Sequence, residues 1–166
     1  MIILGIDPGT ARMGYGIIEI SSKNPKKKNQ KVKLLKTDVI VTPAEVDSHK
    51  RLLMLFENLN RLVEEFSPDA MVVEKIFFNT NVKTALSVGQ ARGISMLVAA
   101  SKKLDFFEYT ALQAKLVLTG YGRSDKKQMQ AAVKQRLKLE DIIKSDDAND
   151  AVAMALCHIN KFYELA

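Results

Sequence analysis

The sequence contains one cysteine, two histidines and no long apolar run, and each shortage excludes a class of protein. The single cysteine, Cys157, has no partner for a disulfide within the chain, which is expected in a reducing cytoplasm. No stretch approaches the roughly 18 apolar residues that a membrane-spanning helix needs. The early apolar run is interrupted by Gly5 and ended by Asp7, so we expect no signal peptide. The sequence has no cluster of cysteine and histidine residues that would predict a zinc site.

What the sequence does have is an excess of positive charge in a chain of ordinary composition. Its 166 residues include 25 basic and 19 acidic side chains, for a net charge of +6. This length fits a single domain over residues 1–166 with a sizeable core. The basic balance favours binding to polyanions, nucleic acid first, although many basic proteins bind no nucleic acid.

The hydrophobic pattern predicts one α/β domain with a mixed sheet and helices packed on it. Short apolar or β-branched runs predict strands over residues 2–6, 14–20, 32–41, 70–74 and 106–109. Apolar residues at three- and four-residue steps predict helices over residues 52–66, 79–103, 111–118, 124–139 and 146–165. Short links make the first three strands an antiparallel meander, and the fourth, which follows a helix, is expected to run parallel to the first.

Four acidic residues occupy positions that this fold can bring together. Asp7 and Glu74 end the first and fourth strands, so parallel neighbours place both carboxylates at one edge of the sheet. Asp147 and Asp150 are three residues apart at the start of the last helix and share a face of it. Docking that face on the sheet would add them to the first pair.

Each acid also has an ordinary explanation. Asp147, like Asp146, lies in the first turn of a helix, where acids offset the macrodipole. Asp7 is also a good first residue for an Asp-Pro-Gly turn. Glu74 is harder to explain, because a carboxylate that ends an apolar strand is costly without a partner. If the acids converge, two carboxylates about 4 Å apart repel by roughly 4 kcal/mol, so hard cations such as magnesium or manganese are needed.

Several short blocks, in order, resemble the RuvC family of Holliday junction resolvases. They are Gly5-Ile6-Asp7-Pro8-Gly9-Thr10, Gly14-Tyr15-Gly16, Val73-Glu74-Lys75-Ile76-Phe77, Gly89-Gln90-Ala91-Arg92-Gly93 and Asp147-Ala148-Asn149-Asp150-Ala151. The match runs from residue 2 to about residue 160. The resemblance implies a ribonuclease H-like fold, a central first strand, and Asp7, Glu74, Asp147 and Asp150 as metal ligands. Asp146 beside Asp147 leaves a one-residue ambiguity, which only the spacing to Asp150 resolves.

The predicted chemistry is phosphodiester hydrolysis with two divalent ions, Mg²⁺ or, as a substitute, Mn²⁺. Asp7 is expected to bridge both ions, Glu74 to hold one, and Asp147 with Asp150 to hold the other. One ion activates the attacking water and its partner stabilises the leaving oxygen. A structure that separates these acids, or buries any of them against an arginine, would refute this hypothesis.

Further residues are candidates for DNA contact. Lys115 and Lys126 match family positions near the scissile strand, where they bind phosphate or stabilise transition-state charge; each also fits a solvated helix lysine, and Lys127 is an equally basic neighbour of Lys126. Arg123 is a weaker candidate from its loop position. Of the adjacent aromatics, the resemblance favours Phe77 over Phe78 as the one that stacks on an unpaired base.

The resemblance also implies a homodimer, in which Gly89 and Gly93 lie in the interface helix, although helix packing within one chain explains them as well. A twofold dimer suits a four-way junction cut by paired symmetric nicks in recombination and repair. A branch-migration helicase complex of the RuvA–RuvB type is the implied partner, and His158 is expected to be structural. The lysine-rich run over residues 23–33 connects the second and third strands at the end opposite to Asp7, so it is interpreted as a solvated loop, with a peripheral DNA contact as the alternative.

Three other functions fit parts of this sequence. A ribonuclease H-like nuclease that acts on RNA shares the acidic residues. A branched-DNA-binding module without catalysis would keep the fold alone, which the full set of four acids argues against. A phosphotransfer ATPase of the sugar-kinase and actin kind also begins with an Asp-x-Gly-Thr loop, but it needs two such lobes and a later glycine-rich nucleotide segment.

Overall fold

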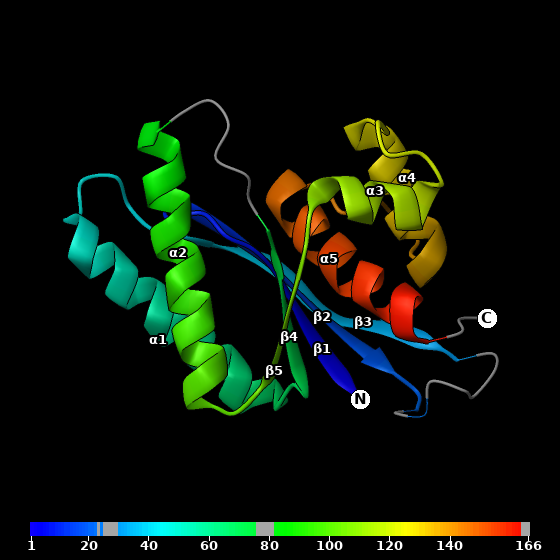
Figure 1. Ribbon diagram of the computed structural model, residues 1–166, viewed down its shortest axis with the longest axis horizontal. Helices are drawn as coiled ribbons and strands as arrows, with labels where there is room; N and C mark the ends of the chain where they lie inside the picture. The colour runs from blue at the N-terminus through cyan, green and yellow to red at the C-terminus, as the bar shows by residue number, and fades with distance from the viewer. Residues whose placement is uncertain (23, 25–29, 76–81, 164–166) are drawn as a thin grey trace.

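A five-stranded sheet with helices on both faces makes up the protein (Figure 1). The computed structural model describes residues 1–22, 24, 30–75 and 82–163. The strands are β1 (Ile2–Asp7), β2 (Arg12–Ile20), β3 (Val32–Val41), β4 (Ala70–Glu74) and β5 (Asp105–Tyr109), in the spatial order β3-β2-β1-β4-β5. β1, β2 and β3 pair antiparallel, whereas β4 is parallel to β1 and β5 is parallel to β4. The predicted mixed sheet with a central first strand is confirmed.

The helices form a layer on each face of the sheet. They are α1 (Ser48–Phe66), α2 (Val82–Ser101), α3 (Ala111–Thr119), α4 (Lys126–Leu137) and α5 (Asp146–Phe162). Helices α1 and α2 cover one face, and α3, α4 and α5 cover the other (Figure 1). Because side chains alternate along a strand, Leu4 and Ile6 pack in the core under α1 and α2, whereas Ile3 packs in the core under α5. Among the helices of the described residues, none combines the length and the hydropathy of a candidate membrane span.

The ends of the elements follow from local hydrogen bonds that periodicity does not reveal. α1 ends at Phe66, as predicted from Pro68, and Ser67 adopts a left-handed φ of 45° with its N–H bonded to the carbonyl of Val63. α4 begins two residues later than expected, at Lys126, because Asp125 and Gln128 form a capping box. β2 begins two residues earlier than expected, because its pairing with β3 extends to Arg12. Residues 79–81 and 164–165 of two predicted helices lie outside the described residues.

Candidate active site

Two of the predicted acids meet at the carboxyl edge of the sheet. Ile6 pairs with Val73 in the parallel β1–β4 register, so Asp7 and Glu74 are the next residues on adjacent strands. Their side chains share a hydrogen bond. The shared edge that the sequence predicts for these two residues is therefore confirmed.

Glycines on the sheet allow α5 to bring the other two acids to the same edge. A Cβ atom at Gly14 would overlap the backbone of Asp147, and one at Gly16 would overlap Val152. A Cβ at Gly5 would overlap the backbone carbonyl of Ala151. Since Gly14 pairs with Asp7, the first turn of α5 lies directly beside the end of β1. In Figure 1 the orange start of α5 lies beside the upper ends of β4 and β5.

The electrostatics of this edge show how closely the acids are grouped. The pKa of Asp7 is raised from 3.8 to about 8, first by burial and then by the charges of Glu74 and Asp150, with a smaller contribution from Asp147. Burial also raises the pKa of Glu74 and of Asp150. The other three predicted ligands thus all act on Asp7, and their accumulated negative charge is the property that a cation site requires.

Cations from α3 and α4 line the same edge. A hollow of about 160 Å³ is bounded by Glu74, Asp150, Lys115 and Lys126 on its polar side and by alanine and methionine side chains of α3, α4 and α5 on its apolar side. Burial raises the pKa of both Glu74 and Asp150, and the positive charge of Lys115 opposes this rise in each. The charge of Lys126 opposes it for Asp150 as well. The expectation that both lysines lie at the catalytic edge is confirmed, whereas their roles stay predictions.

The two neighbouring aspartates in the first turn of α5 have different partners, although, after burial, both contribute to the raised pKa of Asp150. Asp146 turns toward α4, where its Oδ2 accepts a hydrogen bond of 2.6 Å from Nζ of Lys126 and holds the pKa of that lysine above its usual value. Asp147, rather than Asp146, is among the charges that raise the pKa of Asp7. This arrangement favours Asp147 as the residue that joins Asp7.

One contact at this edge was missed by the sequence analysis. Nε of Arg12 lies 2.6 Å from Oδ2 of Asp147, with 53% of the arginine side chain and 31% of the aspartate side chain exposed. The pair is therefore at the surface rather than buried, so the condition that would refute the hypothesis is not met. The available signal was the strand register, since Arg12 lies two residues before the glycine on which the first turn of α5 rests.

The residues at this edge fit divalent metal ions in their chemistry. All four predicted ligands supply carboxylate oxygen, the donor preferred by Mg²⁺ and Mn²⁺, and the raised pKa of the partly buried Asp7 indicates a negative charge that a cation would stabilise. In the described residues, no three His, Cys, Asp or Glu side chains are arranged as a ready metal-binding group. Asp147 is instead paired with Arg12, and Asp7 with Glu74. The ligand assignment stays a prediction.

The remaining predicted residues lie in different surroundings. Arg123 is exposed in the loop between α3 and α4, and Phe77 and Phe78 lie outside the described residues. Most of the lysine-rich run also lies outside the described residues. The strand ends that flank it are at the end of the sheet opposite to Asp7, where Glu19 pairs with both Ile2 and Lys33.

His158 belongs to the core, as expected. It is 4% exposed, Nδ1 of its ring lies 3.1 Å from the hydroxyl of Tyr109, and the ring packs between Phe107 and Phe162. Burial lowers its pKa to about 4.

Helix α2 presents an apolar face that the rest of the described chain does not cover. Leu86, Met96 and Leu97 are exposed there, and a Cβ added at Gly89 or Gly93 would meet no described atom within 4 Å. The sequence allowed two explanations for these glycines, helix packing within one chain or a dimer interface. The described residues do not show the first, because no other element packs against Gly89 or Gly93.

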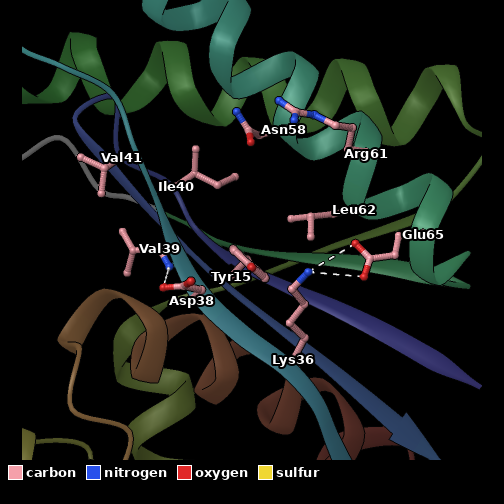
Figure 2. Close-up of a pocket in the computed structure, with 10 residues that line it drawn as sticks. All are labelled: Tyr15, Lys36, Asp38, Val39, Ile40, Val41, Asn58, Arg61, Leu62 and Glu65. Carbon is pink, nitrogen blue, oxygen red and sulfur yellow. Dashed lines mark hydrogen bonds and ion pairs between the residues drawn. The ribbon is translucent and has the colours of Figure 1, made fainter.

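A larger hollow lies on the α1 face of the sheet and holds none of the four acids. This groove of about 370 Å³ lies between β3 and α1, and Tyr15 is among the residues that line it (Figure 2). Nζ of Lys36 lies 3.3 Å from each carboxylate oxygen of Glu65 and joins the two elements. The concentration of charge, and not the size of the hollow, therefore identifies the candidate site.

A central strand that ends on a carboxylate, with further carboxylates from the neighbouring strand and the last helix, defines a nuclease of the ribonuclease H-like class. The model of the family described as crossover junction endodeoxyribonuclease RuvC matches residues 3–158. The chain therefore belongs to the RuvC family. A dependence on divalent metal ions is general in this family.

Relatives and solved structures agree with this assignment over almost the whole chain. A RuvC endonuclease of Alkaliphilus oremlandii is 47% identical over 158 residues, which are 95% of this chain and 92% of that protein. One of Desulfitobacterium hafniense is 48% identical over 160 residues, covering 95% and 92%. The fold matches Thermus thermophilus RuvC with a TM-score of 0.85 at 28% identity, covering 96% and 94%. It matches the same organism's RuvC in complex with a Holliday junction substrate with a TM-score of 0.88 at 27% identity, covering 97% and 94%.

Proposed function

We propose that this protein is a Mg²⁺-dependent endonuclease that resolves four-way (Holliday) DNA junctions by paired symmetric nicks in homologous recombination and repair. The observation that carries the proposal is the convergence of Asp7, Glu74, Asp147 and Asp150 at the edge where α5 lies on the glycines of the sheet. The RuvC relatives and the junction-bound RuvC of Thermus thermophilus support the choice of substrate.

The four acids would hold two Mg²⁺ ions, with Mn²⁺ as a substitute. Asp7 would contribute to both ions, because it ends the central strand and interacts with each of the other three carboxylates. Glu74 would hold one ion, and Asp147 with Asp150 would hold the other. When bound, such ions supply Lewis-acid stabilisation at the scissile phosphate and a more acidic water. The rigid strand ends and the buried helix fix where the ligand oxygens point.

Basic side chains around the acids bind the DNA backbone. Lys115 and Lys126 line the hollow that contains Glu74 and Asp150, so both are placed to neutralise a phosphate held beside the acids. Lys126 is 76% exposed and is free to turn from Asp146 toward a phosphate. Arg123 contacts the backbone farther from the cut, and Phe77 stacks on an unpaired base at the branch.

A homodimer provides the two sites that paired nicks require. The exposed face of α2, with Leu86, Met96 and Leu97 around Gly89 and Gly93, is the interface, since glycines there allow two helices to approach closely. We assign a cytoplasmic location from the single cysteine and the bacterial relatives. The family resemblance supports a branch-migration helicase of the RuvA–RuvB type as partner, and the single sheet supports one nuclease domain over residues 1–166.

Cleavage of a mobile four-way junction beside a linear duplex of the same sequence, with Mg²⁺ or with chelator, tests the proposal. We expect symmetric nicks in the junction alone, only with Mg²⁺. Asp7→Asn should bind the junction and fail to cut it, whereas the exposed Asp141→Asn is a matched control that should cut normally. Equal cutting of both DNAs would contradict junction specificity. Junction binding without any product would favour a non-catalytic module, and cutting of RNA alone would favour a ribonuclease.

A further inference from the structure

We propose that Arg12 is a displaceable counter-ion, which occupies Asp147 in the metal-free enzyme and moves to a phosphate of the DNA when Asp147 takes a metal ion. The inference rests on the proposed function, because it requires both a metal site and a DNA substrate. It assigns a role to a residue that no motif of the sequence singled out.

The first step of the argument is the position of Arg12. It is the first residue of β2, and its guanidinium reaches across to Oδ2 of Asp147, 135 residues later in the chain, at 2.6 Å. A charge-assisted hydrogen bond of this length engages the carboxylate oxygen directly. Oδ2 therefore has a partner before any metal ion arrives.

The second step is the state of the other acids. Asp7 and Glu74 share a hydrogen bond with each other, and Asp150 acts on both of them, so these three carboxylates already face one another. Asp147 is the member of the set that an arginine holds. An ion that takes the lone pair of Oδ2 used by Arg12 displaces the guanidinium as a charged group, because the arginine side chain cannot lose its charge.

The third step is the weakness of this pair. With 53% of Arg12 and 31% of Asp147 exposed, solvent screens the attraction, and exposed pairs of this kind change an equilibrium by only about two- to fivefold. A contact this weak yields to a divalent ion. It differs from the fixed contacts of α5 with Gly14 and Gly16, which are close backbone packing.

The fourth step is the destination of the released side chain. Arg12 lies at the same edge as Lys115 and Lys126, where the scissile strand must approach the acids, and a guanidinium fits phosphate oxygens through two parallel hydrogen bonds. One side chain thus reduces the repulsion among the acids before metal binding and binds the substrate afterwards.

The test compares wild type with Arg12→Gln and Arg12→Lys, and uses Arg136→Gln, ten residues beyond Lys126 on α4, as a matched control. Mn²⁺ is titrated without DNA, and the free ion is followed by electron paramagnetic resonance. We expect Arg12→Gln to bind Mn²⁺ about two- to fivefold more tightly than wild type, and Arg12→Lys to remain near wild type. Unchanged or weaker Mn²⁺ binding by Arg12→Gln would overturn the proposal, because Arg12 would then only orient the carboxylate.

Junction binding in Ca²⁺ over a series of salt concentrations gives the second readout. For Arg12→Gln the slope of log K against log salt should decrease by about one, as for loss of one phosphate contact, and Arg12→Lys should restore it. An unchanged slope would overturn the transfer to phosphate. Failure of the proposed function is distinguishable, because it appears as absent Mn²⁺ binding or absent junction cleavage in the wild type itself. Circular dichroism verifies that each variant is folded.

Discussion

Replacing Asp7 by asparagine should make the metal-free protein more stable while abolishing cleavage. The pKa of Asp7 is raised to about 8 in the folded state, by burial and by Glu74 and Asp150, against an ordinary value of 3.8. The folded protein therefore keeps a proton that the unfolded chain releases between these two values. The stability present below about pH 4 is lost progressively as the pH rises toward 8.

The size of the effect follows from this interval. One pKa unit corresponds to about 1.4 kcal/mol, and pH 7 lies about three units above 3.8, so ionisable Asp7 lowers the free energy of unfolding by up to about 4 kcal/mol. Because Asp7 shares a hydrogen bond with Glu74, part of this free energy reflects the titration of the two carboxyl groups together rather than of Asp7 alone. Asparagine resembles the protonated carboxyl group, and its amide can still donate a hydrogen bond to Glu74. The variant should therefore keep its stability as the pH rises.

Urea unfolding followed by circular dichroism, at fixed protein concentration and in chelator, measures the difference. We expect the free energy of unfolding of Asp7→Asn to be higher than that of wild type, by a difference that grows from about pH 5 to about pH 8. Mg²⁺ should reduce or reverse the gap, because it stabilises the folded wild type more strongly. Asp141→Asn should show no such pH-dependent gain. A wild type as stable as Asp7→Asn at pH 8 without metal would refute the reasoning.

Three further changes test the other features of the site. Gly14→Ala places a Cβ against the backbone of Asp147 and should reduce the free energy of unfolding by about 1–3 kcal/mol and the cleavage rate on the order of 100-fold. The control Gly122→Ala should do much less, because the nearest atom to its Cβ, at 3.3 Å, belongs to the flexible side chain of Leu112. Thermal unfolding and single-turnover cleavage measure both variants. Leu97→Glu should convert a dimer to a monomer in sedimentation equilibrium, and a wild type that is itself monomeric would contradict the α2 interface. Cys157 is fully buried, and burial raises the pKa of its thiol to about 11, so Ellman's reagent should react only after unfolding; rapid reaction of the folded protein would contradict its placement.

The sequence was informative wherever a pattern repeats along the chain. Residues 32–41 and 70–74 were predicted as strands with the observed ends, because β-branched and apolar runs bounded by turn residues specify them. The common edge of Asp7 and Glu74 followed from the parallel pairing of their strands. The antiparallel meander followed from short connections.

Side-chain contacts between distant segments were not predictable in this way. The blocks that contain Gly5, Gly14 and Gly16 were recognised as family motifs, but the sequence does not say that α5 lies on all three. Nor does any spacing relate Arg12 to Asp147, because that contact depends on the distance between β2 and the first turn of α5. Such contacts require the packed fold.

The burial of α5 has a consequence for the dynamics of the enzyme. Every residue from 151 to 159 is buried, and the helix contacts β1, β2 and β4 as well as α3 and α4. An element of this kind exchanges its amide protons only when the entire molecule opens. Asp150 immediately precedes this buried run, so we expect this part of the proposed site to have no separate low-energy opening. In the proposed function, adjustment to the shape of the DNA falls instead to exposed side chains such as Lys126.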